Sequence, residues 1–151
     1  MKITDDLLLH ELADREAIRE LAVLYCDCLW RKDIDGLLRL FADDAIYVMK
    51  GVEVNAVSRG LAAIKRMHER ALNETTPRLF VHNQIVNLLG PDRAAGRCCV
   101  EVRNLGISME WLGIGYFEDE YSRQGDQWKF TERTHTFDGL DSKVYLRTFM
   151  A

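Results

Sequence analysis

Residues 14–49, DREAIRELAVLYCDCLWRKDIDGLLRLFADDAIYVM, decide the fold predicted for this chain. The first half of this run carries an apolar stripe at helical spacing, made by Ile18, Leu21, Ala22, Tyr25 and Leu29. Asp33 then stands where the N-cap of a second, short helix is expected. The acidic pair Asp43-Asp44 is predicted to turn the chain into a strand over 46–49, where β-branched and aromatic residues are common.

The rest of the chain first continues as helix and then changes to strands. A third helix is predicted after Gly60, ending near Leu72, because apolar residues recur on one face between them. Alternating segments then predict strands over about 79–89, 94–104, 108–123 and 127–138, separated by turn residues at 90–92 and 125–126. Helices followed by consecutive strands favour an α+β fold with an antiparallel sheet over alternating βαβ units.

Length and charge limit the kinds of partner. A chain of 151 residues is long enough for one domain with its own core. The net charge of −4 comes without a basic stripe, which argues against nucleic acid as a partner. The sequence has no apolar run of the roughly 18 residues that a membrane span needs, and its first residues do not resemble a signal peptide. We therefore expect a cytoplasmic protein that binds neither nucleic acid nor membrane.

The four cysteines do not form a recognisable framework. Cys26 and Cys28 lie two apart on a predicted helix, and Cys98 and Cys99 are adjacent in a predicted strand. Neither pair has the spacing of a redox or zinc motif, and no cluster of His and Cys accompanies them. The sequence predicts reduced thiols, no metal site and no cofactor.

Several short motifs occur in an order typical of one family. They are Arg15-Glu16-Ala17-Ile18, Tyr25, Asp33-Ile34-Asp35, Phe41-Ala42-Asp43-Asp44-Ala45, Asp119-Glu120-Tyr121, and Trp128-Lys129-Phe130 with Arg133. On these residues the chain resembles the SnoaL-like family of the nuclear-transport-factor-2-like superfamily over nearly its whole length. The resemblance implies a single SnoaL-like domain over 1–151, with a cone-shaped, curved mixed or antiparallel sheet wrapped by three N-terminal helices around an apolar pocket.

The resemblance also suggests catalytic residues, because the lyases and isomerases of this group use general acid–base chemistry in an apolar cavity. His82 is the predicted base, Asp119 its orienter or a second acid–base group, and Tyr25 the donor to an oxyanion. Each has an alternative: His82 in the core or at the end of the sheet, Asp119 facing solvent, and Tyr25 packed in the core. Strand alternation places Phe117, Asp119 and Tyr121 on one face.

Four further residues are predicted to bind substrate. Trp30, Trp111 and Phe80 would provide aromatic walls, and Arg133 would pair with a pocket carboxylate or a substrate anion, with a surface position as the alternative. His68 and His135 are single histidines without a supporting motif, so neither is assigned a role. Trp30 and Val102 stand where many dehydratase-like relatives hold acids, which argues against copying a His/Asp dyad from them.

The family contains proteins of different function, so the resemblance leaves three functions open. The first is a cofactor-free dehydratase or isomerase acting on a cyclic, aromatic or steroid-like substrate. The second is a structural β subunit of a ring-hydroxylating dioxygenase, which the ending Val144-Tyr145-Leu146-Arg147-Thr148-Phe149 also resembles. The third is a non-catalytic protein that binds a small hydrophobic or cyclic ligand. A homodimer or homotrimer is expected from the superfamily.

Overall fold

A computed structural model describes residues 4–51, 55–105 and 111–140. In these ranges the chain forms α1 (Asp5–Arg31), α2 (Ile34–Leu38), β1 (Phe41–Lys50), β2 (Asn55–Arg59), α3 (Leu61–Glu74), β3 (Pro77–Leu88), β4 (Arg93–Asn104), β5 (Trp111–Gln124) and β6 (Gln127–Leu140). The α+β class and the three helices are confirmed. The short strand β2 was not predicted. The start of the strand expected at 108, and the ending at 144–149, lie outside the described residues.

The first two helices follow the pattern in the sequence. The apolar stripe of α1 is buried along its length, from Ile18 to Leu29. The helix ends at Arg31 because Lys32 adopts a left-handed conformation with φ of 57°. Asp33 then caps α2, since its carboxylate accepts a hydrogen bond from the backbone N–H of Gly36 at 2.8 Å. The predicted N-cap is therefore confirmed.

The strands form one six-stranded sheet in the order β2-β1-β6-β5-β4-β3. Only β1 and β6 pair in parallel; the other four pairs are antiparallel. The register between β1 and β6 shifts between Phe41 and Ile46, and the exposed Asp43 and Asp44 lie in this irregular stretch. The acidic pair therefore lies inside β1 and not in a turn before it.

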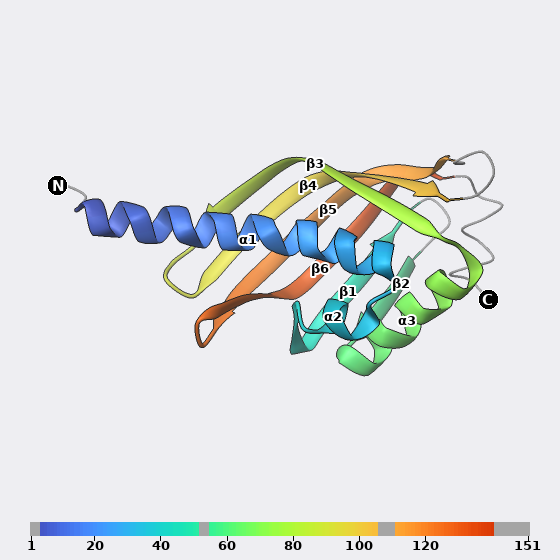
Figure 1. Cartoon of the computed structure of the whole chain (residues 1–151), viewed down its shortest axis with the longest axis horizontal. Coiled ribbons are helices and arrows are strands. Elements are labelled where there is room, and N and C mark those ends of the chain that lie inside the picture. The colour runs from blue at the N-terminus through green and yellow to red at the C-terminus, as the bar shows by residue number, and fades with distance from the viewer. Residues whose placement is uncertain (1–3, 52–54, 106–110, 141–151) are drawn as a thin grey trace.

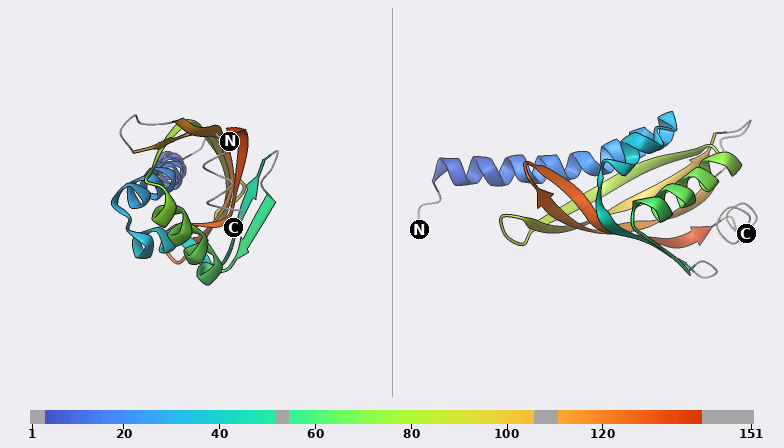
Figure 2. Two further views of the ribbon diagram at one scale, coloured as in Figure 1. Left: turned by 90° about the vertical axis from the view of Figure 1, so that its right-hand side faces the viewer. Right: turned by 90° about the horizontal axis from the view of Figure 1, so that it is seen from below.

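The helices cover one face of this curved sheet. Figure 1 shows α1 running across the strands with its N-terminal end projecting past them, and Figure 2 shows the sheet curling around the helices. The core lies between the two layers, where Tyr47, Val100, Phe117 and Phe130 of the sheet are at most 3% exposed. Large buried aromatic side chains contribute much of the apolar area that holds such a core together.

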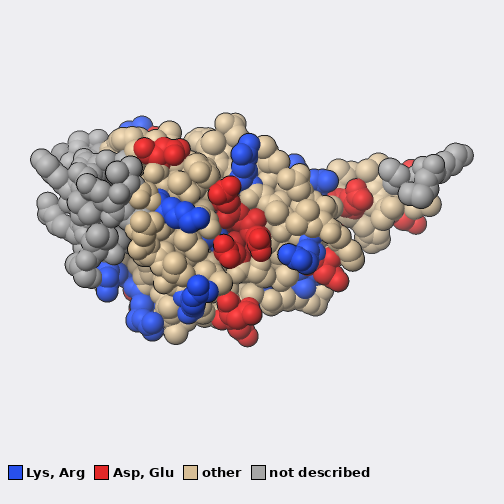
Figure 3. Space-filling view, turned by 180° about the vertical axis from the view of Figure 1, so that it is seen from behind, with Lys and Arg blue, Asp and Glu red and all other residues tan. Residues whose placement is uncertain are grey.

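The other face of the sheet carries acidic and basic side chains among uncharged ones (Figure 3). The alternation predicted for β5 is confirmed, because Phe117, Asp119 and Tyr121 are buried while Glu118 and Glu120 between them are exposed. Glu120 stands directly opposite Glu132 of β6, a pairing of like charges that this face tolerates because water screens it.

Two expectations from composition can be compared with the structure. All four cysteines are free; Cys26, Cys28 and Cys98 are buried and Cys99 is exposed. Of the helices in the described ranges, none combines the length and apolar character that a membrane crossing requires.

Candidate functional site

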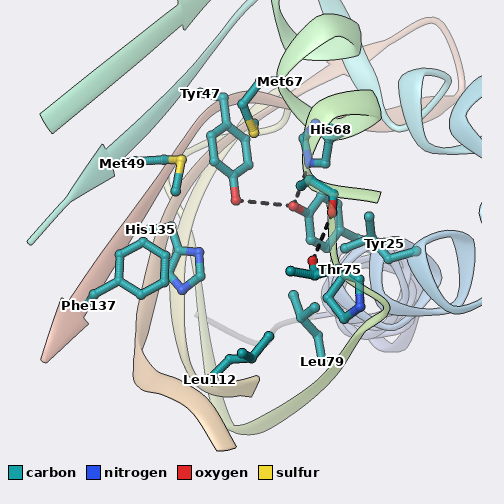
Figure 4. Close-up of a pocket in the computed structure, with 13 residues that line it drawn as sticks. Tyr25, Tyr47, Met49, Met67, His68, Thr75, Leu79, Leu112, His135 and Phe137 are labelled. Carbon is teal, nitrogen blue, oxygen red and sulfur yellow. Dashed lines mark hydrogen bonds between the residues drawn. The ribbon is translucent and has the colours of Figure 1, made fainter. Parts of the chain in front are cut away.

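A small cavity lies between the helices and the inner face of the sheet (Figure 4). Side chains from α1, α3, four of the strands (β1, β3, β5 and β6) and the link before β3 line it: Tyr25, Leu29, Tyr47, Met49, Met67, His68, Ala71, Thr75, Pro77, Leu79, Leu112, His135 and Phe137. It leaves about 50 Å³ for the centres of water-sized molecules. Most of the lining is apolar, so the few polar atoms in it decide what chemistry is possible.

A chain of hydrogen bonds crosses the wall formed by α1, α3 and β1. The hydroxyl oxygen of Tyr25 lies 2.8 Å from Nε2 of His68 and 3.1 Å from the hydroxyl oxygen of Tyr47. The other ring nitrogen of His68, Nδ1, lies 2.8 Å from the carbonyl oxygen of Ile64, one helical turn earlier. Because a carbonyl oxygen only accepts, Nδ1 must carry the proton.

The direction of this chain follows from the protonation state of His68. Burial lowers the pKa of His68 to about 4, so at neutral pH its Nε2 is an acceptor. The hydroxyl of Tyr25 therefore donates a hydrogen bond to Nε2 of His68, and the hydroxyl of Tyr47 donates a hydrogen bond to the oxygen of Tyr25. Burial raises the pKa of Tyr47 to about 12 and that of Tyr25 well above its ordinary value, so both phenols are protonated. The oxygen of Tyr47 is left with lone pairs free to accept a bond from a ligand.

His135 provides a second polar group, on the neighbouring strand β6. Its side chain is buried between the rings of Phe117 and Phe137, whose centroids lie 4.5 and 3.9 Å from its own. Within the described part of the chain, Nε2 of His135 has no hydrogen-bond partner. Burial lowers the pKa of His135 well below its ordinary value, so the ring is neutral. A buried polar atom without a hydrogen-bond partner lowers the stability of the folded protein, so its presence beside a cavity needs an explanation.

Behind Tyr25 lies a buried ion pair that does not line the cavity. Arg133 donates through Nε and one terminal nitrogen to the two carboxylate oxygens of Asp119, at 2.9 and 3.2 Å, and Tyr121 donates to the same carboxylate at 3.0 Å. The guanidinium also lies against the rings of Tyr25, Phe117 and Phe130. Burial raises the pKa of Asp119 against the opposing effect of Arg133. The pair is ionised, because both carboxylate oxygens receive guanidinium hydrogen bonds.

The predicted catalytic residues do not meet in one place. Tyr25 lines the cavity. Asp119 is buried in the ion pair instead, and His82 lies on the outer face of β3 with 54% of its side chain exposed, 4.0 Å from Glu101. Strand alternation explains the position of His82, because Leu79 and Val81 take the inward positions before it. The predicted arrangement of His82, Asp119 and Tyr25 around one cavity is therefore not formed.

The predicted substrate-binding residues also lie elsewhere. Trp30 and Phe80 pack edge to face at the surface, where the indole of Trp30 donates to the carbonyl oxygen of Leu79. Trp111 is 41% exposed because its neighbour Leu112 takes the cavity-facing position. Arg133 is held in the ion pair with Asp119, so the surface alternative for it is wrong.

Two residues of the cavity, His68 and His135, were not identified from the sequence. Each nevertheless had a signal in the pattern around it. His68 follows Ile64 by four residues and precedes Ala71 by three, which places it on the buried stripe of α3. His135 alternates with Arg133 and Phe137 on the inner face of β6. A polar side chain on an otherwise buried stripe was the signal that could have found them.

No nearby carboxylate among the described residues takes the place of the acids that many dehydratase-like relatives hold at the positions of Trp30 and Val102. Val102 is buried on the inner face, and the adjacent Glu101 points outward to Arg103 at 2.6 Å. None of the described cavity residues is Asp or Glu. Among the described residues, no group of three or more His, Cys, Asp or Glu side chains is arranged to hold a metal ion.

Solved structures share this architecture. An NTF2-like protein with a cystatin-like fold from Novosphingobium aromaticivorans is 25% identical, with a TM-score of 0.78 over 99% of this chain and 100% of that one. A protein from the same organism provisionally assigned as a scytalone dehydratase is 18% identical, with a TM-score of 0.73 over 86% and 87% of the two chains.

A third structure from that organism is provisionally assigned as the β subunit of an aromatic-ring-hydroxylating dioxygenase. It is 17% identical, with a TM-score of 0.73 over 86% of this chain and 92% of that one. At this identity the second and third likenesses show a shared fold alone. No curated protein sequence matches the chain.

The sequence profile of the SnoaL-like domain matches residues 10–134, which include all three helices except the start of α1, and five of the six strands in full. The match agrees with the cone of helices and curved sheet and with the cavity they enclose. The chain belongs to the SnoaL-like family and has the NTF2-like fold.

Proposed function

We propose that this protein is a cofactor-free lyase or isomerase that acts on a small cyclic ligand by general acid–base chemistry. One observation carries the proposal: the hydroxyl of Tyr47 and the unpaired Nε2 of His135 face the same small apolar cavity. A hydrogen-bond donor beside an imidazole with a free nitrogen is the minimum needed to remove a proton next to a carbonyl group.

His135 is the proposed base. When its proton is on Nδ1, Nε2 is free to accept a proton from a carbon next to the carbonyl of the ligand. Burial makes the imidazole a weak base while the cavity is empty. Negative charge that develops on the ligand oxygen favours the imidazolium, so the proton affinity of His135 rises as the reaction proceeds. The interaction is therefore stronger in the transition state than in the ground state.

Tyr47 is the proposed donor to the developing oxyanion. To donate to a ligand, its hydroxyl must turn away from Tyr25, which gives up one neutral hydrogen bond of about 1 kcal/mol. A bond to a charged oxygen is about twice as strong as a neutral one. The exchange is therefore nearly neutral for a ground-state carbonyl and favourable for an enolate.

Tyr25 and His68 are positioning residues in this scheme. Tyr25 still donates to His68 after Tyr47 turns, so no buried proton is left unpaired. The carbonyl of Ile64 fixes the tautomer of His68, which keeps the acceptor facing Tyr25. The fold shared with the provisionally assigned scytalone dehydratase supports a lyase as one of the two reaction classes.

A second candidate function is a ligand-binding protein without catalysis. The observation that favours it is that no described cavity residue is a carboxylate, so neither histidine has a partner to bring its pKa toward 7. The two candidates predict different results in one experiment.

The experiment is hydrogen–deuterium exchange of the α-protons of cyclohexanone in D₂O, followed by ¹H NMR. We expect the wild-type protein to accelerate exchange over buffer, and Tyr47→Phe and His135→Gln to lose most of that acceleration. His82→Ala is the matched control, because it removes a histidine that lies outside the cavity. If the wild-type protein does not accelerate exchange, the acid–base proposal is wrong and the binding protein is favoured.

A further inference from the structure

The size of the cavity restricts the possible ligands more tightly than membership of the SnoaL-like family does. A buried water needs about 10–15 Å³ of such centre-accessible space and occupies about 30 Å³ of liquid. The roughly 50 Å³ of this cavity thus corresponds to about three to five waters. An engineered cavity that binds benzene has about 150 Å³, about three times as much. A single six-membered ring is therefore the largest ring system the cavity takes, and it fits only if side chains of the wall move outward.

The charge of the cavity restricts the ligand further. Its described lining has no Asp, Glu, Lys or Arg, and burial keeps both His68 and His135 neutral. The charges of Arg133 and Asp119 compensate each other behind the ring of Tyr25. A carboxylate or ammonium group would lose its hydration without gaining a countercharge, so the cavity disfavours both.

The fixed direction of the hydrogen-bond chain selects the polar group of the ligand. Tyr47 donates a hydrogen bond to Tyr25, and Tyr25 donates one to His68. The oxygen of Tyr47 is therefore available as a hydrogen-bond acceptor for a ligand in the cavity. A hydroxyl on the ligand donates to this oxygen without breaking any existing bond. A neutral carbonyl in the same place would first have to displace the bond between Tyr47 and Tyr25.

From size, charge and hydrogen-bond direction together, we propose that the cavity binds an uncharged, single-ring compound carrying a hydroxyl group, and that the hydroxyl donates to Tyr47. The inference rests on the proposed function, since it describes the ligand of the same site. The ring packs against the apolar wall that includes Phe137 and Leu112.

Two methionines in the wall give a way to test the size limit. Met49 and Met67 line the cavity, and unbranched thioether side chains adapt more easily than branched ones. Met67→Ala, with its side chain half-buried on α3, enlarges the cavity without touching the hydrogen-bond chain.

The experiment is isothermal titration at pH 7 with five probes that differ in one property each: phenol, toluene, benzoate, benzylamine and 2-naphthol. We expect phenol to bind the wild-type protein at least about tenfold more tightly than the other four. Tyr47→Phe should bring the affinity for phenol down to that for toluene. Met67→Ala should raise the affinity for 2-naphthol above that of the wild-type protein.

The results separate this inference from the proposed reaction. If phenol binds as expected but cyclohexanone does not exchange, the acid–base function is wrong and the ligand class stands. If benzoate or 2-naphthol binds the wild-type protein as tightly as phenol, the ligand class is wrong, whatever the exchange experiment shows. Failure of all five probes to bind also overturns the ligand class.

Discussion

The hydroxyl of Tyr25 on α1 lies 2.8 Å from Nε2 of His68 on α3, and both side chains are at most 3% exposed. This contact joins two helices that are far apart in the sequence and have few other direct links. The hydroxyl oxygen of Tyr25 also accepts a hydrogen bond from the hydroxyl of Tyr47 on β1. A single oxygen therefore connects α1, α3 and β1 at the wall of the cavity.

Removing this oxygen should destabilise the protein. Tyr25→Phe leaves Nε2 of His68 buried without a donor, so we expect the free energy of unfolding to fall by about 1–3 kcal/mol. Urea denaturation measures the change. Tyr116→Phe is the matched control, because Tyr116 lies on the outer face of β5, and its effect should stay within about 0.5 kcal/mol. Equal losses in the two variants would show that the bond to His68 contributes nothing.

The stability should depend on pH because two histidines are buried in the neutral form. The pKa of His68 is about 4 in the folded protein and about 6.5 when unfolded, so the unfolded chain binds more protons between these values. The contribution is fully present above pH 6.5 and is lost as the pH falls toward 4. The slope approaches about 1.4 kcal/mol per pH unit for each such histidine.

Urea titrations at pH 7, 6 and 5 measure this slope. The pKa of His135 is also lowered, so His135→Phe should reduce the slope and His68→Asn should reduce it as well. His10 is exposed near the start of α1, and His10→Asn should leave the slope unchanged. A wild-type stability that is flat from pH 7 to 5 would contradict the burial of neutral histidines.

Replacing His135 should separate stability from activity. His135→Phe removes the unpaired Nε2 and keeps an aromatic ring between Phe117 and Phe137, so we expect the free energy of unfolding to rise by about 1–3 kcal/mol. The same variant should no longer accelerate the hydrogen–deuterium exchange of the α-protons of cyclohexanone. His68→Phe is the contrasting variant: it should destabilise the protein, because Tyr25 loses its acceptor. A destabilised His135→Phe variant would mean that Nε2 has a partner.

The ion pair between Asp119 and Arg133 should prove structural. Asp119→Ala leaves a buried guanidinium unpaired, and we expect a loss of about 3–5 kcal/mol. The double variant Asp119→Leu, Arg133→Met removes both charges and should recover most of that loss in urea denaturation. If Asp119→Ala instead abolishes exchange at full stability, Asp119 has a catalytic role after all.

Much of the fold could be predicted because local patterns express it directly. The stripe around Tyr25, the cap at Asp33 and the alternation of Phe117, Asp119 and Tyr121 all survive in the structure. The short strand β2 was missed, since its five residues, Asn55–Arg59, are too few for a clear alternation and become a strand only by pairing with β1.

The sequence by itself determined the family, the class of fold and the buried stripe of α1 on which Tyr25 lies, because helical and strand periodicity depend on neighbours in the chain. Only the tertiary structure decided which polar groups share the cavity. His82 lies at an outward-facing position of its strand, and Asp119 pairs with Arg133 outside the cavity. His68 and His135, which belong to elements far apart in the sequence, both line the cavity. Such meetings depend on how α3 and β6 pack against the rest of the fold, and no local pattern records that packing.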